Sequence, residues 1–219
     1  MSKGSSPRED TTASTYTDLG ATTEEAYRIS RTSRELARAT IGNAGPEDRI
    51  RQRCSVAVGD FAMAELMRFV GHPVEAGLRA LRSNAPIIAD IRMVQVGIQR
   101  KGHRSEVLCA LDFGQAIAER EGITRTSAGF VELGERLNGS IVVIGNAPSA
   151  LLKVLDMTKN GIVPALVIGT PVGFVNAKES KELLRAADIP SVSNEGTRGG
   201  TPVAVAAMNE MITMLSEGP

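Results

Sequence analysis

Short, unbroken runs of apolar residues recur along the chain, and each run is bounded by glycine, proline or polar residues. Such runs predict strands buried on both faces, which we place at residues 86–90, 107–111, 140–144, 165–168 and 189–192. The segments between them have helical spacing, among them residues 73–82, 113–121 and 127–137. This alternation predicts a three-layer α/β/α fold around a mostly parallel, five-stranded, Rossmann-like sheet.

Two helices are predicted before the first of these strands. The first covers residues 24–39, and the second runs from Pro46 to about Phe69 with apolar positions close to a 3.6-residue period. Gly59 interrupts the second helix, where we expect a bend, because an interior glycine costs about 1 kcal/mol. Residues 1–22 are rich in serine and threonine and predict a flexible N-terminal tail. Residues 23–219 then form a single α/β domain.

Composition narrows the classes of function. The 219 residues contain 25 Lys and Arg and 25 Asp and Glu, so the net charge is zero and no basic surface for nucleic acid is indicated. No apolar run reaches the ~18–20 residues that span a bilayer, and the polar start lacks a secretory signal, so we expect a cytoplasmic protein without a membrane partner. Cys54 and Cys109 form no metal-ligand motif, and we expect buried free thiols and no metal site.

Three of the predicted strands end in a loop rich in glycine and proline that leads directly into a helix. These loops lie at residues 145–149, 169–174 and 194–200. In open α/β sheets, ligands bind outside the carboxyl ends of the strands, where such loops gather. Helix N-termini there offer free N–H groups and a partial positive charge to carboxylates or phosphates. The loops therefore predict a binding site for a large anionic ligand.

The sequences of these loops resemble one family. From about residue 24 to 215 the chain resembles the precorrin-8X methylmutase (precorrin isomerase) family of cobalamin biosynthesis. The resemblance rests on several segments in order: Tyr27 and Ser30; Arg53 and Gly59; Asp90, Met93 and Gly97; Thr124-Arg125; Gly145-Asn146-Ala147-Pro148-Ser149; Pro171-Val172-Gly173-Phe174-Val175; Glu179-Ser180-Lys181; and Arg198-Gly199-Gly200-Thr201.

The resemblance implies a homodimeric isomerase that needs no cofactor. The family moves a methyl group from C11 to C12 of a contracted tetrapyrrole, precorrin-8X or cobalt-precorrin-8, to give hydrogenobyrinate or cobyrinate. Because the shift is intramolecular, the protein has to hold the macrocycle in a reactive form and supply one proton. The substrate-binding positions that the resemblance implies are Tyr27, Ser30, Arg53, Asp90, Arg125, Gly145, Asn146, Pro171, Gly173, Arg198, Gly199 and Gly200.

The chain departs from the family pattern at the catalytic position. The family supplies its proton from a histidine in an Arg-x-x-His-x-x-Gly motif, and Val56 occupies that position here, between Arg53 and Gly59. Valine cannot donate a proton. Asp60, four residues after Val56 and one helical turn along the same face, is the candidate for a substitute acid. A second departure is Glu195, a carboxylate where the family commonly has arginine.

Three functions remain open from the sequence. The first is a methylmutase with an altered proton donor. The second is a paralogue that binds a tetrapyrrole or corrinoid without turning it over, which Val56 favours. The third, a nucleotide-binding α/β enzyme that uses the loops at Gly145 or Gly196, lacks both GxGxxG and GxxxxGK[ST] after any strand.

Overall fold

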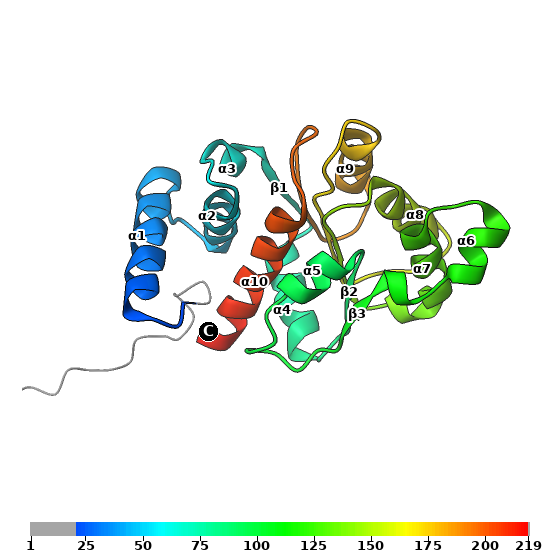
Figure 1. The fold of residues 1–219 in the computed structure, drawn as a ribbon, viewed down its shortest axis with the longest axis horizontal. Coiled ribbons are helices and arrows are strands. Elements are labelled where there is room, and N and C mark those ends of the chain that lie inside the picture. The colour runs from blue at the N-terminus through cyan, green and yellow to red at the C-terminus, as the bar shows by residue number, and fades with distance from the viewer. Residues whose placement is uncertain (1–20, 219) are drawn as a thin grey trace, which may run out of the picture.

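Six short strands form one sheet within residues 21–218, the part of the chain that this computed structural model describes (Figure 1). The strand order is β1-β6-β5-β4-β2-β3. Five strands are parallel to one another: β2 (Ile87–Ala89), β3 (Val107–Cys109), β4 (Ile141–Ile144), β5 (Leu166–Gly169) and β6 (Ser191–Asn194). These are the five strands that the apolar runs predict. The predicted tail falls almost entirely on residues 1–20, which lie outside the described part.

The sixth strand corrects the prediction of a five-stranded sheet. β1 (Met67–Val70) pairs antiparallel with β6 along one edge, with Met67 opposite Asn194. Sequence periodicity assigned these residues to a helix extending to Phe69. That helix ends much earlier, because Gly59 adopts a left-handed conformation (φ 66°) and its N–H bonds back to the last turn. The predicted long helix is therefore α2 (Pro46–Val58), α3 (Ala62–Leu66) and then β1.

Helices cover both faces of the sheet. One face carries α4 (Pro73–Arg82), α5 (Arg92–Gly97) and α10 (Thr201–Glu217), and the other carries α7 (Arg125–Leu133), α8 (Pro148–Lys159) and α9 (Ala177–Ala186). The short α6 (Gln115–Glu121) and two 3₁₀ turns, η1 (Ala110–Asp112) and η2 (Gly134–Leu137), complete the second side. Successive strand residues alternate between the layers, as Val143 and Val142 do. The three-layer α/β/α fold is confirmed.

An additional helical layer lies outside α10. α2 packs on α10, and α1 (Glu24–Ile41) packs on the far side of α2, at the edge of the molecule in Figure 1. Thr23 caps α1 by accepting a hydrogen bond from the Ala26 N–H (3.2 Å). Within residues 21–218, no helix is long and apolar enough to cross a membrane.

Candidate active site

The loops at the carboxyl ends of the parallel strands are joined by a buried carboxylate. Asp90 follows β2 and is fully buried, and its Oδ2 accepts hydrogen bonds from the N–H groups of Asn146 (2.7 Å) and Ala147 (3.0 Å). Its Oδ1 accepts the Ile91 N–H (2.9 Å). Burial raises the pKa of Asp90, and these backbone N–H bonds act in the opposite direction. The contacts assign Asp90 to holding the loop after β4 against the end of β2.

The glycine-rich loops after β5 and β6 lie in direct contact. The Gly200 N–H donates to the Thr170 carbonyl (2.7 Å), and the Gly173 N–H donates to the Thr197 carbonyl (3.1 Å). Gly199 has φ 146°, and a Cβ there would lie 2.3 Å from the Thr170 carbonyl oxygen. Only glycine permits this approach. Gly145 is also a contact glycine, because a Cβ there would lie 2.9 Å from the Thr201 Cα at the start of α10.

The loop after β6 carries two charged side chains, and each has an ionic partner. Arg198 is half exposed and its Nη2 contacts the Asp60 Oδ2 at 2.7 Å. Glu195 forms two close contacts with Arg68 of β1, at 3.0 Å and 2.8 Å. The carboxylate that departs from the family pattern is therefore neutralised by an arginine on the edge strand. Glu195 therefore adds no unpaired negative charge to this loop.

Asp60 does not continue the helix that carries Val56. Since Gly59 ends α2, the expectation that both side chains share a helical face is wrong. Asp60 begins the connection to α3, and its Oδ1 accepts the Ala62 N–H (2.9 Å) while its Oδ2 accepts from Arg198. Both oxygens are used as acceptors. Its role as a substitute acid stays a prediction, and the observed role is to connect the end of α2 to the loop after β6.

Arg125, Asn146 and Pro171 also lie at the carboxyl ends of strands. The Arg125 guanidinium donates to the Leu111 carbonyl (3.1 Å) just beyond β3. Asn146 is exposed in the loop after β4, whereas Pro171 is buried after β5. The structure thus brings together Asp90, Arg125, Gly145, Asn146, Pro171, Gly173, Arg198, Gly199 and Gly200, with Asp60 added through Arg198. Their contact with a ligand stays a prediction.

Arg53 lies apart from these loops. Its Nη1 contacts the Glu210 Oε2 (3.0 Å) and the Thr213 hydroxyl (3.0 Å) on α10. Glu210 is nine residues after Thr201, where α10 leaves the glycine loop, which is about 14 Å along a helix. Tyr27 and Ser30 lie on α1, which packs on α2, and Ser30 is buried while Tyr27 is exposed. Within one chain, these three residues therefore lie away from the loops at the carboxyl ends of the strands.

Within residues 21–218, no histidine, cysteine or acidic side chain lines the cavity beside Val56. Val56 borders a cavity of about 10 Å³, room for no more than one water molecule. The other lining residues are Arg34, Ala37, Arg49, Gln52 and Arg53. Burial raises the pKa of the neighbouring Cys54 thiol to about 12, which makes it a poorer acid than an ordinary cysteine.

Neither histidine lies in that cavity. His103 follows α5, where its Nε2 is 2.8 Å from the Gln99 carbonyl and its Nδ1 accepts the Ser105 N–H (3.1 Å). His72 is the residue before α4, with a left-handed backbone (φ 52°). Cys54 and Cys109 are buried free thiols, as predicted. Within residues 21–218, no group of three His, Cys, Asp or Glu side chains could hold a metal ion.

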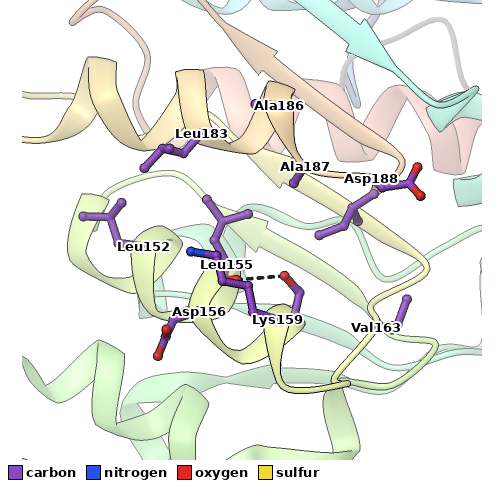
Figure 2. Close-up of a pocket in the computed structure, with 11 residues that line it drawn as sticks. Leu152, Leu155, Asp156, Lys159, Val163, Leu183, Ala186, Ala187 and Asp188 are labelled. Atoms are coloured by element: carbon purple, nitrogen blue, oxygen red, sulfur yellow. Dashed lines mark hydrogen bonds between the residues drawn. The ribbon is translucent and has the colours of Figure 1, made fainter.

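Two cavities differ in their relation to the loops. One of about 510 Å³ lies beside the loop after β6 and is lined by Leu66, Lys178, Glu182, Arg185, Glu195, Gly196, Thr197 and Arg198. Another, of about 550 Å³, lies between α8 and α9 and is lined mainly by aliphatic side chains such as Leu155 and Leu183 (Figure 2). Val163 and Ile189 in its lining precede β5 and β6, so this cavity is at the opposite end of the sheet from the glycine loops.

Sequence reasoning missed the residues that hold the loops from below. Lys181 and Asn194 are both fully buried and bond to the backbone of the loop after β6. A signal for Lys181 exists, because Ala177, Lys181 and Leu184 have helical spacing on the buried face of α9. Glu210 carried no comparable signal, since its three arginine partners lie between 157 and 176 residues away in the sequence.

Comparisons with known proteins identify the family. The family model described as precorrin-8X methylmutase matches residues 28–214. The chain is 42% identical over 202 residues to the cobalt-precorrin-8 methylmutase of Methanothermobacter thermautotrophicus, covering 90% of this chain and 97% of that one. It is 40% identical over 199 residues to the precorrin-8X methylmutase of Pseudomonas aeruginosa, covering 86% and 96%. It also matches a longer cobalamin biosynthesis protein of Archaeoglobus fulgidus, with 39% identity over 41% of that protein's length.

The fold agrees with this assignment. The crystal structure of precorrin-8X methylmutase from Thermus thermophilus superimposes with a TM-score of 0.80 at 34% identity, covering 87% of this chain and 97% of that one. The sequence match spans the three loops, the helix of Val56 and the sheet that positions them. The chain belongs to the precorrin-8X methylmutase family, whose members are isomerases of cobalamin biosynthesis.

Proposed function

We propose that this chain binds precorrin-8X or cobalt-precorrin-8 at the loops after β2, β4, β5 and β6, and transfers the methyl group from C11 to C12. The shift is intramolecular and requires no external methyl donor. Holding the macrocycle in one reactive tautomer and shape is therefore the main contribution that the protein has to make. The substrate-binding roles of the residues gathered at these loops form part of this proposal.

The observation that carries the proposal is the buried carboxylate beneath the loops. A buried carboxylate is costly unless hydrogen bonds compensate for its lost hydration. Asp90 accepts hydrogen bonds from backbone N–H groups, two of them from the loop after β4. The same end of the sheet has Gly199 against the Thr170 carbonyl. Both arrangements hold loops in one conformation, which is what a positioning enzyme requires.

Val56 sets the expected rate. A positioned general acid typically contributes about 10²–10⁴-fold to a rate. Since valine cannot supply the proton, and both oxygens of Asp60, the candidate substitute acid, already accept hydrogen bonds, we propose that positioning alone carries the methyl shift in this chain. The natural protein should then be slow, and Val56→His should accelerate it.

A second candidate function rests on the same residue. A protein that binds the macrocycle and does not turn it over would have no use for a histidine at position 56, and Val56 favours this alternative. Such a protein would serve as a carrier of a tetrapyrrole or corrinoid. It would bind hydrogenobyrinate tightly and leave precorrin-8X unchanged.

The two candidates are separated by one experiment. The wild-type chain, Val56→His and Val56→Ala are each incubated with precorrin-8X, and the visible absorption spectrum is followed as the methyl group migrates. Val56→Ala controls for the loss of the valine side chain without adding an imidazole. Turnover by the wild-type chain supports the methylmutase. If only Val56→His turns over precorrin-8X and the wild-type chain binds hydrogenobyrinate, the natural protein is the carrier. If the wild-type chain neither turns over precorrin-8X nor binds hydrogenobyrinate, both candidate functions are wrong.

We also propose that the protein is a cytoplasmic homodimer. Large apolar side chains are exposed in the loop after β5, where Phe174 is 95% and Val175 is 76% exposed. Exposed apolar groups of this kind are typical of surfaces that a partner covers. Light scattering on the purified chain should give twice the mass of one chain, and Phe174→Asp should shift it toward the monomer. A wild-type monomer at micromolar concentration would exclude the dimer.

A further inference from the structure

Lys181 is a buried amine to which the proposed reaction assigns no role. It lies on the inward face of α9 and has no exposed surface. Buried lysines are rare unless a carboxylate or several acceptors compensate for the charge. None of the ion pairs formed by residues 21–218 includes Lys181. Its acceptors belong to the end of β6 and to the loop that follows.

The contacts of Lys181 converge on one backbone carbonyl. Its Nζ donates to the Arg198 carbonyl at 2.6 Å and to the Asn194 Oδ1 at 3.3 Å. The Asn194 Nδ2 donates to the same Arg198 carbonyl, also at 2.6 Å, and to the Glu195 carbonyl at 3.1 Å. Two buried side chains thus supply two donors to one carbonyl in a partly exposed loop.

That carbonyl belongs to the residue whose side chain contacts Asp60. One residue later, Gly199 lies against the Thr170 carbonyl, and the Gly200 N–H bonds to it. With its carbonyl held from below, Arg198 extends toward Asp60 and contacts it at 2.7 Å. Figure 1 shows this loop rising beside α9 and leading into α10. The loop backbone is thus held at residue 198 by Lys181 and Asn194 and at residue 200 by the Thr170 carbonyl.

We propose that Lys181 is a positioning residue, which together with Asn194 holds the loop after β6 closed and presents Arg198 at the ligand-binding end of the sheet. It does not touch the reacting atoms. Its contribution to turnover rests on the proposed function, whereas its effect on the loop can be measured without a substrate.

The electrostatics of the site give this proposal a characteristic pH dependence. Burial, and then repulsion from Arg185 on the same helix, lower the pKa of Lys181 to about 8. The elements packed against the loop carry further charged groups: Glu195 and Arg198 in the loop itself, Arg68 on β1, and Lys178 and Glu182 on α9. An open loop would expose the amine and restore its ordinary pKa of about 10.4.

The sign of the pH effect follows from linkage. The open loop binds more protons than the closed loop between pH 8 and about 10.4, so rising pH favours closure in that window. The opening equilibrium should be level below about pH 7 and fall about 15-fold from pH 8.0 to 9.5. A residue that only fills space beneath the loop would not produce this dependence.

The test is millisecond hydrogen–deuterium exchange of peptides covering residues 195–201, corrected for the intrinsic rate at each pH. In Lys181→Met, which keeps an unbranched apolar side chain, these amides should exchange about tenfold faster than in the wild type at pH 7.5. The decrease in opening above pH 8 should also disappear. Lys159→Met serves as the control, because Lys159 is an exposed lysine at the far end of α8. It should leave both observations unchanged.

Turnover gives a second reading. Lys181→Met should raise the KM for precorrin-8X about tenfold and change kcat about threefold or less, since it alters the placement of a binding group. Unchanged loop exchange in a folded Lys181→Met protein would overturn the proposal. If that variant does not fold, a wild-type opening equilibrium that stays level from pH 8.0 to 9.5 would overturn it. Absence of wild-type turnover and product binding would refute the proposed function and leave the exchange result to decide on Lys181.

Discussion

Replacing Glu210 with glutamine removes a carboxylate that three arginines share. Glu210 is 1% exposed on α10, and it contacts Arg34 (3.0 Å), Arg49 (2.8 Å) and Arg53 (3.0 Å). These arginines come from α1 and α2, so Glu210 joins the outer helical layer to the helix that covers the sheet. Glu210→Gln keeps the size of the side chain and deletes its charge.

The cost follows from what remains buried. After the substitution, Arg53 stays only 10% exposed, and Arg34 and Arg49 stay 22% and 27% exposed, without their shared carboxylate. Burial already lowers the pKa of Arg53 against the raising effect of Glu210. Breaking a buried ion pair by removing one partner costs about 3–5 kcal/mol. For a domain of this size, about 2–4 °C per kcal/mol gives a decrease in Tm of about 6–20 °C.

Thermal and urea unfolding of the wild type, Glu210→Gln and Glu217→Gln would measure this loss of stability. Glu217 contacts Arg49 at 2.6 Å but is 28% exposed, so its substitution should cost less than about 1 kcal/mol. Adding Arg53→Met to Glu210→Gln should recover part of the loss, because the most buried unpaired cation is then gone. A loss below about 1 kcal/mol for Glu210→Gln would refute the idea that the cluster anchors α1 and α2.

Three further predictions concern the loops. In urea unfolding, Gly199→Ala should destabilise the chain by at least about 1 kcal/mol more than Gly161→Ala. Both glycines have positive φ (146° and 93°), but only at Gly199 would the new Cβ meet a backbone carbonyl, at 2.3 Å. Because burial raises the pKa of Asp90, its contribution to the free energy of unfolding should fall as the pH rises from about 4 through that raised pKa. Asp90→Asn should abolish this pH dependence when unfolding is measured at a series of acidic pH values. Asp60→Asn frees the Arg198 guanidinium from an exposed ion pair worth about 0.2–1 kcal/mol. The variant should therefore bind hydrogenobyrinate about 1.4- to 5-fold more tightly in a spectroscopic titration, and weaker binding would contradict this prediction.

The sequence predicted the parallel strands because their signal is local. Residues 141–144 are four consecutive apolar residues, all fully buried, between polar residues and a glycine loop. The predicted helix after Pro46 failed at Gly59 for a different reason. Residues 61–69 kept apolar positions at helical spacing, and their pairing with β6, more than 120 residues away, decides that Met67–Val70 forms a strand. Tertiary pairing of an edge strand overrides a local pattern.

The candidate site divides in the same way. The glycine loops were visible in the sequence because glycine and proline directly after an apolar run mark the carboxyl end of a strand. The loop partners of Asp90 and the partners of Arg53 and Glu195 were not visible, because they come from distant segments and no spacing rule connects them. Position 195 shows the consequence: the sequence presents an unpaired carboxylate in a loop, and the structure pairs it with Arg68, 127 residues earlier.

Placement of the substrate and transfer of the proton depend on different residues in this chain, and the fold shows the residues for placement. The loops are held by Asp90, by Gly199 against Thr170 and by Lys181, and none of these contacts involves residue 56. A substitution at residue 56 can therefore remove the family's acid while the binding end of the sheet keeps its shape. Retention of the loops is thus evidence for binding, and the identity of residue 56 is evidence about rate. Measurements of affinity and of turnover on the same variants are needed to weigh the two.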